Sequence, residues 1–65
     1  MFYIELEFNS QTVMVNMDEV LYFTPDGNRS NSAIVYMPRH TLFVGNSYEE
    51  IRDKVIKRQG YVDYR

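Results

Sequence analysis

The side chains most capable of chemistry in this sequence are a single histidine, His40, and four serines, and the chain has no cysteine. Nucleophilic catalysis needs a serine or cysteine beside a base that a third group orients. The serines fall in stretches whose composition favours turns or a helix cap, which accounts for them without catalysis. A metal site would need His40 to meet carboxylates from elsewhere in the fold, and no ligand spacing predicts this. We therefore expect neither an enzyme nor a bound metal or cofactor.

The basic side chains offer a different chemistry, the binding of phosphate groups. Arg39 and His40 have no acidic neighbour in the sequence, and Arg29 lies in a polar stretch before them. These three residues form the candidate site for a nucleic acid or a phosphate-bearing small ligand. The formal charge of −2 works against general attraction to anionic partners, so this is the less favoured of two binding hypotheses.

The segment VGNSYEEIRDKVIKRQG, residues 44–60, carries the signals of an α-helix. Ser47 and Glu50 have the spacing of a capping box, in which each side chain accepts a hydrogen bond from the other residue's backbone N–H. Gly60 is suited to the left-handed conformation that ends many helices. We predict a helix over 48–59 that buries one narrow apolar stripe, formed by Tyr48, Ile51 and Val55.

The rest of the sequence consists of short runs that favour β-strands, separated by turn-forming residues. In the clearest run, FYIELEF, apolar and polar positions alternate with a period of two. The densest turn-forming stretch, PDGNRSNS over 25–32, predicts an exposed, mobile hairpin loop. The tail 60–65 either frays or adds to a sheet edge. We predict strands over residues 2–8, 12–16, 20–24, 33–37 and 41–44.

These elements predict one α+β domain over residues 1–65, with a small antiparallel five-stranded sheet and a C-terminal helix packed on one face. The strands follow one another as a meander. A helix is about 10 Å wide and strands lie nearly 5 Å apart, so the helix covers two or three strands. The alternative is a sheet that curls into a small barrel and buries its own apolar side chains.

A flat sheet would leave apolar side chains on the face opposite the helix. Exposed apolar surface of this kind marks interaction sites, where tyrosine and methionine are enriched. We therefore expect the protein to associate with another protein or with a second copy of itself, unless the sheet curls and removes this face. The face includes Tyr3, Met14, Tyr22, Val35, Met37 and Phe43, of which Tyr3, Tyr22, Met37 and Phe43 are assigned to partner binding.

The stretches LEFNSQTVMVN, FTPDG and FVGNSYEEIRDKVIK, within residues 4–57, carry a resemblance to a known family. They are similar to corresponding stretches of the FlbD-like small proteins associated with flagellar and swarming motility. Ser10, where that family has a turn glycine, and Met17, where it has a proline, depart from the pattern. The resemblance implies the same layout of strands followed by a helix, and a regulatory role in motility. Small phage proteins share this layout, so a phage origin is equally open.

The sequence also predicts a cytoplasmic protein without membrane insertion. No apolar run approaches the roughly 20 residues that span a bilayer, and the N-terminus MFYIELEF carries acidic rather than basic residues. The two binding hypotheses differ in their response to salt. Apolar association with a protein tolerates salt, whereas binding of nucleic acid or phosphate weakens steeply as salt rises.

Overall fold

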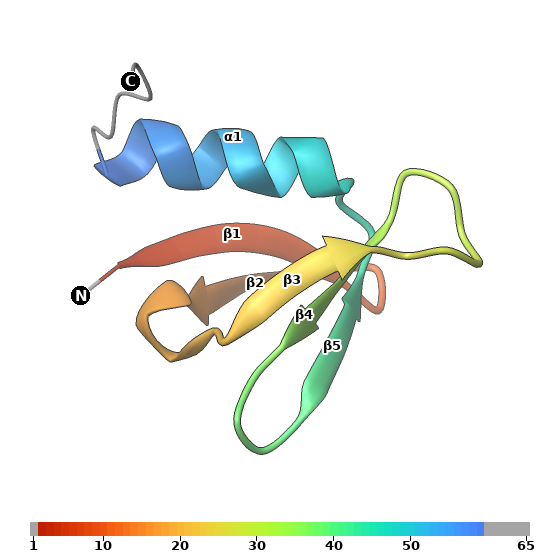
Figure 1. The fold of residues 1–65 in the computed structure, drawn as a ribbon, viewed down its shortest axis with the longest axis horizontal. Helices are drawn as coiled ribbons and strands as arrows, with labels where there is room; N and C mark the ends of the chain where they lie inside the picture. Colours follow the sequence, from red (N-terminus) through yellow and green to blue (C-terminus); the bar gives the residue numbers. More distant parts are fainter. Residues whose placement is uncertain (1, 60–65) are drawn as a thin grey trace.

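The strands form two small antiparallel sheets in the computed structural model of the protein, which describes residues 2–59 (Figure 1). The first sheet is a hairpin of β1 (Tyr3–Phe8) and β2 (Gln11–Asn16). The second contains β3 (Tyr22–Pro25), β4 (Ala33–Tyr36) and β5 (Thr41–Val44), with β4 in the middle. A 3₁₀ turn, η1 (Met17–Glu19), joins the sheets, and the helix α1 spans Tyr48–Gln59.

The α+β class is confirmed, but the prediction of one five-stranded sheet is wrong. The reason lies in the turn η1. The side-chain oxygen of Asn16 accepts a hydrogen bond from the N–H of Asp18 at 3.0 Å, and the N–H of Val20 donates to the carbonyl of Met17 at 3.3 Å. This turn separates β2 from β3, so β3 begins only at Tyr22 and pairs with β4 alone.

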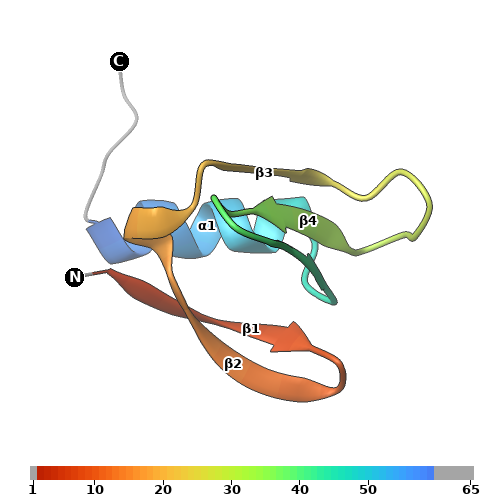
Figure 2. The same cartoon turned by 90° about the horizontal axis from the view of Figure 1, so that it is seen from below.

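The two sheets face each other across the core, and α1 runs along the side where β1 and β3 are both in contact with it (Figure 2). The sequence predicted a helix packed on one face of a single sheet. The helix instead contacts a strand of each sheet. The inner faces cover one another instead, in the manner of the curled alternative. The buried apolar side chains come from both sheets and the helix: Ile4, Leu6, Val15, Ala33, Val35, Val44 and Ile51.

The strand register decides which side chains of the second sheet face the core. Val35 lies opposite Phe23 on β3 and Leu42 on β5, and all three point inward. The expectation that Val35 is exposed is wrong, because this register places it on the core face with no exposed area. Met37 follows β4 and is half-buried against the core, while its N–H donates to the carbonyl of His40 at 3.0 Å and closes the β4–β5 hairpin.

The chain between β5 and α1 fastens β1 to the rest of the protein. The N–H of Gly45 donates to the carbonyl of Glu7 at 2.9 Å, and the buried side chain of Asn46 accepts from the N–H of Glu7 at 2.7 Å. Asn46 also donates through Nδ2 to the Glu50 carboxylate at 2.8 Å. At the start of the helix, the Ser47 hydroxyl accepts from the N–H of Glu50 at 3.1 Å, which is one of the two hydrogen bonds of the predicted capping box. The Glu50 carboxylate accepts from Asn46 rather than from the N–H of Ser47.

The predictions for Gly60 and for the tail 60–65 lie outside the described residues. Within residues 2–59, α1 spans Tyr48–Gln59, the same bounds as the predicted helix. Ile51 is fully buried in the core, and Tyr48 packs its ring against Phe23 with the ring centroids 5.3 Å apart. No helix in this part of the chain is long and apolar enough to cross a membrane.

Candidate interaction surface

The outward face of the second sheet carries the largest side chains that the fold leaves uncovered. In an antiparallel pair, residues directly opposite one another point to the same face. Tyr22 lies opposite Tyr36, and Ile34 lies opposite Phe43, so these side chains share the face that Val35 does not. We call Tyr22, Ile34, Tyr36 and Phe43 the outer surface.

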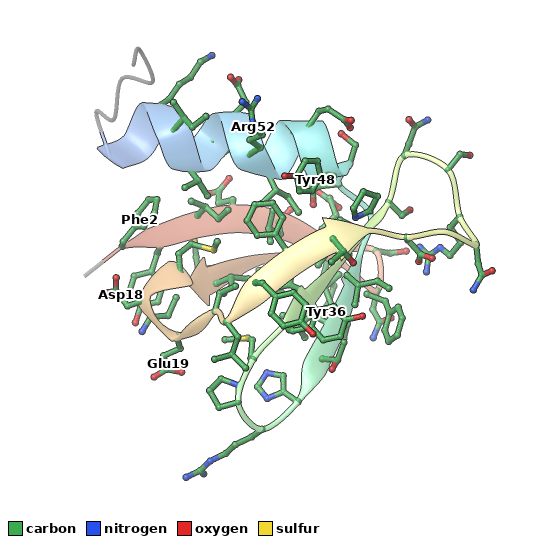
Figure 3. The ribbon with its side chains drawn as sticks, viewed as in Figure 1. Phe2, Asp18, Glu19, Tyr36, Tyr48 and Arg52 are labelled. Carbon is green, nitrogen blue, oxygen red and sulfur yellow. The ribbon has the colours of Figure 1, made fainter. Side chains whose placement is uncertain are left out.

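The outer surface is both aromatic and accessible. Tyr22 is 55% exposed and Phe43 is 52% exposed, while Ile34 and Tyr36 are half-buried. The rings of Tyr22 and Tyr36 stack with their centroids 4.5 Å apart and their planes 18° apart. Figure 3 shows Tyr36 on the second sheet. The other strand residues that share this face are Thr24 and Thr41, so none of the strand residues on it is charged. At its margin, Phe43 lines a hollow with Arg29 and Glu7. An uncharged aromatic centre is typical of protein interfaces.

The four residues assigned to partner binding do not come together in one site. Tyr22 and Phe43 lie on the outer surface, whereas Met37 is half-buried beyond the end of β4. Tyr3 belongs to the other sheet, where it lines a shallow hollow with Met14, Lys54 and Lys57. Ile34 and Tyr36 were not among the residues predicted from the sequence. The signal that could find them is the period of two along AIVY, combined with a register that pairs Tyr36 with Tyr22.

The three residues of the phosphate-binding hypothesis are also separated. Arg39 and His40 lie in the β4–β5 turn, and Arg29 lies in the β3–β4 loop at the opposite end of β4. Arg39 and His40 line a hollow together with Asp18 and Glu19 of η1. Asp18 and Glu19 are distant from Arg39 in the sequence, so the sequence did not predict that they line the same hollow. Their carboxylates make the hollow mixed in charge and poorly suited to an anion.

Charged side chains of α1 pair with one another along the helix. Lys54 pairs with Glu50 at 3.8 Å and Lys57 pairs with Asp53 at 3.2 Å, both at the i,i+4 spacing of helix pairs. These pairs are well exposed to solvent, so each contributes little to stability. Over the described part of the chain, no three histidine, aspartate or glutamate side chains gather closely enough to hold a metal ion.

Comparison with known proteins does not assign the chain to a family. No protein-family model, curated protein or solved structure matches it. Function must therefore be inferred from the architecture and from the surfaces it exposes. The structure describes a small α+β domain whose second sheet carries an uncharged aromatic face.

Proposed function

We propose that this protein is a non-enzymatic cytoplasmic interaction module that binds a partner protein on its outer surface. The observation that carries this proposal is the exposure of Tyr22 and Phe43 on a sheet face whose strand residues are uncharged. Large aromatic side chains are costly to leave in water and contribute much of the binding energy where partners cover them. Covering them with a partner therefore provides a favourable free energy of association.

The size of the outer surface indicates what kind of partner fits. Strands of four residues at about 3.3 Å per residue, with three strands about 4.8 Å apart, give a face of roughly 13 Å by 14 Å. Stable interfaces between folded proteins bury about 800 Å² on each partner, which is several times this area. A short apolar segment of a partner protein matches the available surface better than a second folded domain does.

The resemblance to FlbD-like proteins supports a regulatory role in motility, and a phage relative with the same layout is the alternative source. Binding of nucleic acid through Arg39 and His40 has less support, because Asp18 and Glu19 line the same hollow. Exposed aromatic rings can also stack on bases, so the two functions must be separated by experiment. Salt separates them, since apolar association persists at high salt and phosphate binding does not.

The test is affinity capture from a lysate of the source organism with the wild-type chain and with Phe43→Glu and Tyr22→Glu. A carboxylate introduced on a covered apolar surface must lose its hydration, so we expect capture to fall at least ten-fold while the circular dichroism spectrum is unchanged. Asn28→Glu introduces the same charge in the exposed β3–β4 loop and should capture the partner as the wild type does.

Two outcomes would contradict the proposal. One is undiminished capture of the same protein by both aromatic variants, which would place the interaction elsewhere. The other is capture of nucleic acid by the wild-type chain that disappears as salt is raised to about 0.5 M, where charge interactions are screened within a few ångströms. That result would favour the phosphate-binding hypothesis in its place.

A further inference from the structure

The free edge of β2 is a second surface, distinct from the outer surface. β2 pairs with β1 alone, and no other strand between residues 2 and 59 pairs with it. The opposite edge of β1, by contrast, is covered. Gly45 and Asn46 hydrogen-bond to the backbone of Glu7, and Lys54 donates to the carbonyl of Glu5 at 3.3 Å. The first sheet thus has one closed edge and one open edge.

The hydrogen-bond pattern shows which residues of β2 face the open edge. The N–H of Met17, directly after β2, donates to the carbonyl of Phe2 at 2.7 Å. Backbone groups alternate in direction along an antiparallel strand, so Val15 and Val13 also point toward β1. It follows that Thr12 and Met14 direct both their N–H and C=O groups away from β1, at the open edge. Asn16 directs its N–H there, while its carbonyl, at the N-cap of η1, accepts the first hydrogen bond of that turn.

This edge lacks the features that normally prevent pairing with another strand. Edge strands are commonly protected by charged side chains, proline, a bulge or a covering element. The β2 sequence QTVMVN contains no charge and no proline, and its register with β1 is continuous from Tyr3–Asn16 to Phe8–Gln11. A two-stranded sheet is also the least stable size of sheet, so added strands would stabilise it.

We propose that β2 pairs antiparallel with β2 of a second copy of this chain, in a symmetric register centred on Met14. In that register Met14 lies opposite Met14 of the second copy, and Thr12 lies opposite Asn16. The two Met14 residues exchange two N–H···O bonds, and the N–H of each Asn16 donates to the carbonyl of Thr12 in the other copy. A register centred on Val13 would leave the N–H of Asn16 unpaired. The result is a four-stranded sheet that spans both copies.

The side chains of β2 support a second copy as the partner. In the Met14 register, Val13 lies opposite Val15 of the second copy, on the core side of the sheet. Val13 is only partly buried within one copy. On the other side, Met14, now 58% exposed, lies beside its counterpart, and the polar Thr12 meets the polar Asn16. Apolar residues thus meet apolar ones, polar residues meet polar ones, and no charge is placed opposite a like charge.

The first test uses the absence of cysteine from the chain, because a single introduced cysteine can form a disulfide only with another molecule. Opposed residues of a hydrogen-bonded antiparallel pair have Cα atoms about 5.5 Å apart, within the range that a disulfide spans. Met14→Cys should therefore convert almost completely to a covalent dimer under mild oxidation. The control Thr12→Cys lies on the same strand, but four residues separate it from its counterpart along the strands, roughly 14 Å. It should crosslink at least ten-fold more slowly.

The second test measures the oligomeric state by sedimentation equilibrium. A strand-edge interface is small, so we expect a weak dimer with a dissociation constant in the micromolar range or above. Met14→Lys places two like charges opposite each other and should raise the dissociation constant at least ten-fold, with an unchanged circular dichroism spectrum. Leu21→Lys, at a 64% exposed site between η1 and β3, should dimerise as the wild type does.

The β2 dimer does not depend on the proposed partner binding by the outer surface, and different results would overturn each proposal. Equal crosslinking of Met14→Cys and Thr12→Cys, or a wild-type chain that stays monomeric at about 1 mM, would overturn the β2 pairing. So would a dimer that Phe43→Glu dissociates and Met14→Lys does not, since it would form through the outer surface. Loss of partner capture by Phe43→Glu, with the β2 dimer intact, would leave both proposals standing.

Discussion

Asn46 is the residue whose replacement tests the architecture most directly. Its side chain is 6% exposed, and it joins the end of β1 to the start of α1. Oδ1 accepts from the N–H of Glu7 at 2.7 Å, and Nδ2 donates to the Glu50 carboxylate at 2.8 Å. In Asn46→Ala both hydrogen bonds are lost, and the N–H of Glu7 is left without its acceptor in a partly buried position. The connection between the two sheets should weaken.

The expected loss follows from the energies of the two hydrogen bonds. Each contributes about 1 kcal/mol net, and an unsatisfied buried donor costs about 1–3 kcal/mol, so we expect Asn46→Ala to lower the free energy of unfolding by about 2–3 kcal/mol. In a domain of this size each kcal/mol shifts the melting midpoint by about 4–8 °C. The midpoint should therefore fall by roughly 10–20 °C, which is a large share of the stability of a small domain.

Urea unfolding followed by circular dichroism measures this loss, with Asn28→Ala in the exposed β3–β4 loop as the matched control. The control should change the free energy of unfolding by less than about 0.5 kcal/mol. Asn46→Asp adds a second check, because it retains an acceptor for Glu7 but sets two carboxylates against each other. Its stability relative to the wild type should improve as pH is lowered, because protonation relieves the repulsion between the two carboxylates and restores a donor. A loss below 0.5 kcal/mol in Asn46→Ala would refute the reasoning.

Two further substitutions test the core and the first hairpin. Ile51 has no exposed area, so Ile51→Ala should lower the free energy of unfolding by about 2–4 kcal/mol in the same urea assay, and an unchanged midpoint would show that α1 does not dock through this residue. Ser10 has a φ of 63°, in the left-handed region that glycine adopts without strain, so Ser10→Gly should raise the thermal midpoint by a few degrees, corresponding to about 0.5–1 kcal/mol. A lower midpoint for Ser10→Gly would mean that the added freedom of the unfolded chain outweighs the relieved strain.

The helix could be predicted from the sequence because its signals are local. Ser47 caps the N–H of Glu50 at 3.1 Å, and the apolar stripe that contains Ile51 repeats at the helical period. The first hairpin is local in the same sense. Asn9 and Ser10 both adopt positive φ and form a two-residue turn, and the alternation of FYIELEF continues into a strand that pairs over its full length. Residues close in sequence determine the type and bounds of these elements, although their stability comes from packing in the fold.

The outer surface depended on contacts that the sequence does not contain. A shift of one residue in register moves every side chain of a strand to the other face, and the register of β4 is set by its packing between β3 and β5. Val35 and Tyr36 are neighbours in one strand and therefore point to opposite faces. Without the register, the sequence could not show which of the two faces the core. The separation of Arg29 from Arg39, and the hollow that Arg39 lines together with Asp18, likewise follow from how the chain folds.

The sequence by itself determined the α+β class, the helix, the first hairpin and the presence of more apolar side chains than one helix can cover. Only the tertiary structure decided how those side chains are divided between core and surface. The turn η1 prevents β2 from pairing with β3, and the two resulting sheets then bury their inner faces against each other. Burial of apolar area is non-directional, so it favours any arrangement that removes such area from water. The backbone hydrogen bonds at η1 and at Glu7 select the one observed.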